Sequence, residues 1–129
     1  MALPDCSQSI VYRLCLSIGL VWIIVNLDPS YESGSHWVAI YLPKQGQGHY
    51  MDSFGRSPSS AVVSSLDRNC NYNWSYNKRK LQEDLSMLCG YYCIEYLSLC
   101  PDYTEFYSRF THCNPENDPN LLKTVSRRF

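Results

Sequence analysis

The 129-residue chain has no excess of charge of either sign. It contains 11 basic and 12 acidic residues, which gives a formal net charge of −1. A dedicated nucleic-acid-binding protein is usually basic, so the composition argues against that class. Charged residues make up only 18% and hydrophobic residues 45%, which excludes an intrinsically disordered chain. We therefore expect one folded domain over residues 1–129.

The cysteines form neither a complete disulfide framework nor a zinc motif. There are seven of them, and an odd number cannot all pair within the chain. No two are spaced as C-x-x-C, and Cys100, His112 and Cys113 do not match a known zinc spacing. We expect no metal and a reduced, intracellular protein with several buried thiols.

The sequence has no hydrophobic run long enough to cross a membrane. The most hydrophobic stretch, Leu14–Leu27, is shorter than the ~20 residues that a membrane span needs. Residues 26–29 do not resemble the small-residue cleavage site of a signal peptide. Because the run is rich in β-branched residues, it predicts a buried strand. We expect a soluble monomer with no membrane partner.

Strands come first along the chain and most helices follow. Strands are predicted at 36–42 and 49–54, joined as a hairpin by the loop 44–48, and at 78–82. Helices are predicted at 57–67, 89–100, 103–110 and 119–127. Ser57 and Asp118 are the predicted caps of the first and last helix, each followed by a proline in the first turn. This order indicates an α+β fold.

Five residues have the side chains or backbone freedom that thiol catalysis requires. Cys89 lies where a helix begins, and the helix dipole there lowers the pKa of a thiol. His36 is the candidate base, and Asp52 can hold its imidazole in one tautomer. Gln82 can donate its side-chain N–H to an oxyanion beside the Cys89 backbone N–H, and Gly90 allows close approach of a substrate. Each residue alone has an ordinary structural explanation, so the inference depends on their combination.

The order and spacing of these residues resemble those of adenovirus-type maturation proteases. His36-Trp37, then Asp52 in the string HYMDSFGRSP, then Gln-x6-Cys-Gly ending at Cys89-Gly90 carry the resemblance. It extends over roughly residues 20–125, whereas residues 1–17 are not matched, so the N-terminus is expected to be truncated. The related SUMO- and ubiquitin-like-specific proteases typically have one residue fewer between glutamine and cysteine, but share the aspartate. This mixture is expected in proteases of Polinton/Maverick transposons and their viral relatives.

The resemblance implies both a fold and a reaction. The fold is that of the papain-like cysteine proteases in His–Asp–Cys order, with a mixed sheet packed against the helix that carries the nucleophile. The reaction is endopeptidase cleavage after glycine in small-residue sequences, through an acyl-enzyme, to process virus-like or transposon capsid precursors. Trp37 would form one wall of a narrow tunnel for the substrate, with Gly90 beside it.

The resemblance also implies activators, although the chemistry requires no cofactor. Adenoviral enzymes use a disulfide-linked peptide and DNA, and Cys70 lies about where the peptide-linking cysteine would be. A loop thiol without a partner is the alternative. The basic runs 78–80 and 127–128 could make weak contacts with DNA, but short runs of this kind are usually solvated faces. The expected location is the nucleus.

Two other functions are compatible with the same residues. The first is a protease that removes SUMO or another ubiquitin-like modifier. The second is an inactive binding domain of a decayed mobile element. The presence of His36, Asp52, Gln82 and Cys89 together counts against decay.

Overall fold

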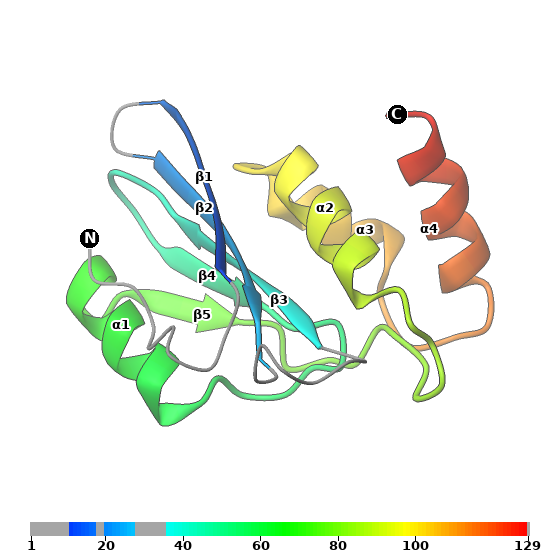
Figure 1. The fold of residues 1–129 in the computed structure, drawn as a ribbon, viewed down its shortest axis with the longest axis horizontal. Helices are drawn as coiled ribbons and strands as arrows, with labels where there is room; N and C mark the ends of the chain where they lie inside the picture. Colours follow the sequence, from blue (N-terminus) through cyan, green and yellow to red (C-terminus); the bar gives the residue numbers. More distant parts are fainter. Residues whose placement is uncertain (1–10, 18–19, 28–35, 129) are drawn as a thin grey trace.

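The computed structural model describes residues 11–17, 20–27 and 36–128 (Figure 1). Its strands are β1 (Val11–Ser17), β2 (Leu20–Asn26), β3 (Trp37–Leu42), β4 (Gly48–Met51) and β5 (Trp74–Tyr76). Its helices are α1 (Ser60–Cys70), α2 (Cys89–Leu99), α3 (Tyr103–Arg109) and α4 (Asn117–Ser126).

The five described strands form one mixed sheet in the order β1-β2-β3-β4-β5. Neighbouring strands are antiparallel except β4 and β5, which are parallel. Figure 1 shows α1 on one face of this sheet and α2 with the remaining helices on the other. The middle strand β3 is therefore covered on both faces, and its residues from Val38 onward are all buried.

The side chains of β3 alternate between two hydrophobic cores. Ala39 and Tyr41 belong to the core on the α2 face, and Val38, Ile40 and Leu42 to the core on the α1 face. This alternation is what the two-residue period of a strand requires. β3 is apolar along its whole length because helices cover both of its faces.

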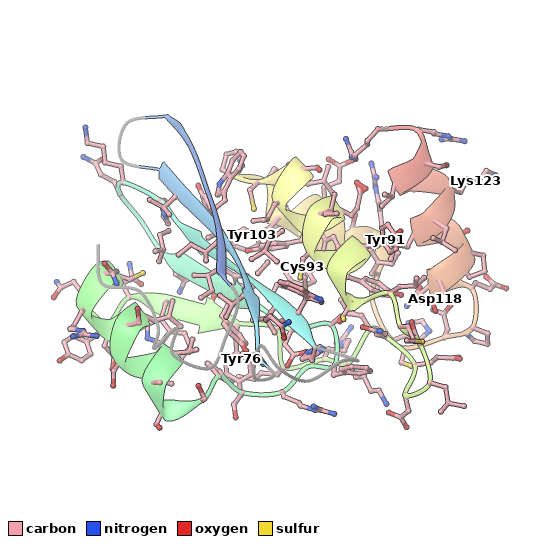
Figure 2. The ribbon with its side chains drawn as sticks, viewed as in Figure 1. Tyr76, Tyr91, Cys93, Tyr103, Asp118 and Lys123 are labelled. Atoms are coloured by element: carbon pink, nitrogen blue, oxygen red, sulfur yellow. The ribbon has the colours of Figure 1, made fainter. Side chains whose placement is uncertain are left out.

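Helix α2 packs directly on the sheet. Its buried residues include Tyr92, Cys93, Tyr96 and Leu97, which join Ala39 of β3 in one core. Figure 2 shows Cys93 on the side of α2 that faces the sheet. The predicted architecture is confirmed: a mixed sheet packs against the helix that begins at Cys89.

Two strand predictions are corrected by the structure. The run 14–27 is divided between β1 and β2, which pair antiparallel with Ser17 opposite Leu20. Residues 78–82 are not a strand, because the backbone N–H groups of Leu81 and Gln82 both donate to the carbonyl of Ser53 and make no ladder. The strand of this region is β5, a few residues earlier.

Two predicted helix starts also differ. Helix α1 is capped by Ser59, whose hydroxyl accepts from the Val62 N–H, and not by Ser57. Helix α4 begins at Asn117, so Asp118 lies inside the first turn, where its carboxylate accepts a hydrogen bond from the Tyr92 hydroxyl at 2.8 Å. Within the described ranges, no helix combines the length and the apolar character needed to cross a membrane.

Candidate active site

The hairpin of β3 and β4 brings His36 and Asp52 together. His36 directly precedes β3 and Asp52 directly follows β4, and the two strands are antiparallel neighbours. The distance from His36 Nε2 to Asp52 Oδ1 is 2.7 Å, and the Asp52 side chain is 1% exposed. A buried carboxylate on Nε2 fixes the ring orientation and leaves Nδ1 as the nitrogen for a reaction partner.

The partner of His36 is Cys89 at the first turn of α2. The Cys89 thiol is buried and hydrogen-bonds with the His36 side chain. The backbone N–H of Trp37 also points to the Cys89 sulfur, at 3.4 Å. Because α2 packs on β3, the nucleophile and the base come from elements that are held together by the core. The predicted trio His36, Asp52 and Cys89 is assembled in the structure.

The electrostatics of the trio favour a thiolate–imidazolium pair. Burial by itself would lower the pKa of His36, but the bonds and charges of Asp52 and Cys89 outweigh it and raise that pKa to about 9. Burial would raise the pKa of Cys89, but the hydrogen bonds from His36 and from the Trp37 N–H outweigh it, so the pKa lies below its ordinary value. A thiol with a lowered pKa beside a protonated imidazole is the arrangement of a nucleophilic cysteine.

The backbone of Asp52 is held by a residue that the sequence did not indicate. The Asp52 N–H donates to Asn77 Oδ1 at 2.9 Å, and Asn77 Nδ2 donates to the Asp52 carbonyl at 2.6 Å. The Phe54 N–H adds a bond to Asp52 Oδ1 at 2.8 Å. Asn77 lies in a loop after β5 without any motif around it, so no sequence signal could have identified it.

Gln82 is fully buried beside the turn that follows Asp52. Its backbone N–H donates to the Ser53 carbonyl at 3.0 Å, and its side-chain oxygen accepts from the Ser53 hydroxyl. Its side-chain nitrogen donates to Ser86, to the carbonyl at 2.9 Å and to the hydroxyl at 3.1 Å. The role of Gln82 and of the Cys89 N–H as oxyanion donors stays a prediction.

Trp37 and Gly90 line one pocket next to the thiol. This pocket has a volume of about 430 Å³, and it is lined by Ile24, Trp37, Met87, Gly90, Tyr91 and Ile94. A Cβ added to Gly90 would lie 3.8 Å from Trp37 Cδ1, so a side chain there would fill space between the helix and the indole. The two predicted substrate-binding residues are thus neighbours on an apolar surface.

Cys70 and Arg128 have their contacts elsewhere in the fold, whereas the first basic run directly follows Asn77, and Lys80 Nζ lies 5.9 Å from the centre of the Phe54 ring. Cys70 ends α1 and packs against Gly48, where burial raises the pKa of its thiol, and its peptide disulfide stays a prediction. Arg128 of the second basic run is bound by the buried Glu95. In residues 11–17, 20–27 and 36–128 no three His, Cys, Asp or Glu side chains are grouped so that they could hold a metal.

A viral protein named as a thiol protease is similar to this chain in sequence, and a viral protease is similar to it in structure. The chain is 29% identical over 112 aligned residues to R355, a protein of Acanthamoeba polyphaga mimivirus named as a thiol protease. Its structure matches the crystal structure of the selenomethionine ASFV pS273R protease with a TM-score of 0.56 and 25% identity. The chain resembles viral cysteine proteases. The fold is accordingly α+β of the papain-like cysteine protease type, as the resemblance of the sequence to adenovirus-type proteases implies.

The likeness extends over most of this chain but over less than half of either relative. It covers 72% of this chain and 37% of the mimivirus protein, and 74% of this chain and 40% of the ASFV protease. No protein-family profile matches the chain.

Proposed function

We propose that this chain is a cysteine endopeptidase that cleaves after glycine and processes the structural precursors of a virus or a virus-like transposon. The observation that supports the activity most directly is the contact among Cys89, His36 and the buried Asp52. In that arrangement the Cys89 sulfur attacks the scissile carbonyl, His36 gives its proton to the leaving amine, and an acyl-enzyme forms. Water then releases the product with His36 as general base.

Glycine on the acyl side of the scissile bond suits the pocket beside the thiol. Trp37 and Gly90 line it together, and because Gly90 has no side chain, a substrate backbone can approach between the first turn of α2 and the indole. A residue without a side chain can bring its carbonyl to Cys89 there, whereas a larger residue would contact the indole. Met87, Tyr91 and Ile94 extend the same surface and favour an apolar substrate side chain nearby.

Removal of a modifier such as SUMO or ubiquitin is the second candidate, because such modifiers present a Gly-Gly end to the same pocket. Activation by a peptide at Cys70 or by DNA, a nuclear location and an origin in a Polinton/Maverick element or an adenovirus relative remain parts of the proposal. They rest on the sequence resemblance.

Hydrolysis of a Gly-Gly peptide tests the proposal when it is measured beside SUMO and ubiquitin vinyl-sulfone probes. Turnover should be abolished in Cys89→Ala, because the nucleophile is removed. Cys93→Ala is the matched control one turn along α2, since Cys93 is fully buried and burial holds the pKa of its thiol well above the ordinary value. This variant should keep the reaction.

Each outcome favours one candidate. Peptide turnover without a modifier adduct supports precursor processing, and a Cys89-dependent adduct with either modifier supports deconjugation. Equal loss of turnover in a folded Cys93→Ala variant would contradict Cys89 as the nucleophile. Neither turnover nor adduct from the folded protein would favour an inactive binding domain.

A further inference from the structure

The amide group of Gln82 is held in one orientation by Ser53. The Ser53 hydroxyl donates to Gln82 Oε1, and both side chains are fully buried. The Ser53 carbonyl also accepts the backbone N–H groups of Leu81 at 2.8 Å and of Gln82 at 3.0 Å. With its oxygen engaged by Ser53, the amide can turn only its NH₂ group toward the loop that leads to Cys89.

The NH₂ group donates to two oxygen atoms of Ser86. Gln82 Nε2 is 2.9 Å from the Ser86 carbonyl oxygen and 3.1 Å from the Ser86 hydroxyl oxygen. A primary amide has two N–H donors, so an oxyanion would compete with the two Ser86 oxygens for them. The Ser86 hydroxyl also accepts the Leu88 N–H at 3.3 Å, one residue before the nucleophile.

Apart from the Lys80–Asp84 ion pair at the surface, few contacts in the described structure fix the loop that carries Ser86. Its backbone makes one turn, from the Ser86 N–H to the Glu83 carbonyl at 3.0 Å, and the side chains of Leu85 and Met87 are 95% and 84% exposed. Met87, next to Ser86, lines the apolar pocket that also contains Trp37 and Gly90. A substrate in that pocket would therefore touch the residue adjacent to the Gln82 bonds.

We infer that the Ser86 hydroxyl is a latch on the oxyanion donor. In the resting protein it holds one N–H of Gln82, and contact of the substrate with Met87 displaces it, so that this N–H becomes available to the oxyanion. Ser53 and the Ser86 carbonyl keep the amide in position when the hydroxyl has left. Ser86 is thus a positioning residue that acts through Gln82, and this inference rests on the proposed protease activity.

The test combines turnover with the affinity of a peptide aldehyde that ends in Gly-glycinal. The Cys89 sulfur adds to the aldehyde carbon, the carbonyl electron pair moves to the oxygen, and no bond of the peptide is broken. Ser86→Ala removes the latch without removing the donor. Since the net value of one neutral hydrogen bond is small, we expect kcat to rise and the aldehyde dissociation constant to fall roughly two- to tenfold, with KM nearly unchanged.

Two further comparisons connect the effect to Gln82. Ser86→Ala should have no effect in a Gln82→Ala background, where there is no amide to release. Ser86→Thr, which keeps the hydroxyl, should restore wild-type behaviour, and Ser98→Ala controls for loss of an exposed serine on α2. Ser86→Gly is the second removal should the alanine variant fail to fold, which circular dichroism would show.

The inference is overturned if Ser86→Ala lowers kcat and aldehyde affinity. It is also overturned if Ser86→Ala raises both by the same factor in the Gln82→Ala background as in the wild type. An aldehyde affinity that responds as expected in a protein without peptide turnover would support the latch and contradict the proposed endopeptidase. Normal peptide turnover, with kcat and aldehyde affinity unchanged in Ser86→Ala, would support the endopeptidase and contradict the latch. No Cys89-dependent aldehyde binding would contradict both.

Discussion

At the scale of single residues, burial works against both charges of the catalytic pair. It disfavours the Cys89 thiolate and the His36 imidazolium alike, and each is stabilised by the other and by neighbouring groups. For the imidazolium, Asp52 contributes most from outside the pair. Its carboxylate is 1% exposed, and its Oδ2 has no hydrogen-bond partner within the described part of the chain, so its negative charge is balanced chiefly through His36.

Asp52→Asn should therefore shift the alkaline limb of the pH–activity profile. In the wild type His36 keeps its proton up to its pKa of about 9, and activity falls as the pH rises through that value. Replacing the carboxylate by an amide removes a negative charge, lowers the pKa of His36 and moves the limb to lower pH. Loss of a hydrogen bond to a charged group should also lower kcat/KM roughly 10- to 100-fold.

The profile is measured as kcat/KM against pH for both proteins. Asp84→Asn is the control, because Asp84 is exposed and pairs only with Lys80 in the described structure. An alkaline limb that stays in place in Asp52→Asn would mean that another group controls it.

The catalytic residues could be predicted at this scale, but their supports could not. His36, Asp52 and Cys89 are residue types with few alternative functions, and each lies in a distinctive local sequence. His36 and Cys89 also lie at the start of a predicted strand and a predicted helix. Asn77 and Ser86 are common loop residues. Their contacts depend on how separate loops meet, which neither periodicity nor spacing encodes.

At the scale of elements, the site is built where β3, β4 and α2 meet. The hairpin and the helix from Cys89 were predicted because their patterns are long and regular. The continuous hydrophobicity of residues 14–27 predicts one strand, but the structure divides the run between β1 and β2, in keeping with the typical strand length of about 5–6 residues. The run 78–82 has too few apolar residues to show alternation, and its backbone is bound to Ser53 instead of a neighbouring strand.

Asn77→Ala should weaken the junction between β5 and the end of β4. The buried Asn77 amide exchanges two hydrogen bonds with the backbone of Asp52, and alanine would leave that N–H and carbonyl unsatisfied. We expect the free energy of unfolding to fall by about 1–3 kcal/mol and kcat to fall with it. Urea unfolding and steady-state kinetics measure both, with the exposed Asn73→Ala as control. Unchanged stability together with unchanged kcat would contradict this role.

At the scale of the whole molecule, the helix with the nucleophile lies between the sheet and the last helix. Glu95 of α2 is fully buried, and its carboxylate accepts the Nε–H of Arg128, which lies 3.0 and 3.1 Å from its two oxygens, and an N–H of Arg128 Nη2. Arg128 follows α4, so this ion pair ties the end of the described chain to α2. The two residues are far apart in sequence, and the sequence indicated Arg128 only as part of a solvated basic run.

Arg128→Ala should destabilise the fold because it leaves the Glu95 charge buried without its partner. Breaking such a pair costs about 3–5 kcal/mol when both groups are buried, and Arg128 is 34% exposed, so we expect about 1–3 kcal/mol. Thermal and urea unfolding measure the loss. Arg127→Ala, at an exposed neighbour, should change stability by less than about 0.5 kcal/mol. Glu95→Gln should reduce the cost of Arg128→Ala, and an equal cost in both backgrounds would contradict the ion pair.

The reactivity of the Cys89 thiol at acid pH tests the central claim most directly. At pH ~6 an ordinary thiol with a pKa near 8.5 is less than about 1% ionised, whereas a cysteine paired with an imidazolium can be mostly thiolate. Limiting iodoacetamide followed by peptide mass mapping should label Cys89 first, ahead of the more weakly ionised Cys70 and the buried Cys93 and Cys100. His36→Ala should slow the labelling of Cys89 and leave the others unchanged. Similar rates for several cysteines, or wild-type labelling in His36→Ala, would show that the pair does not form.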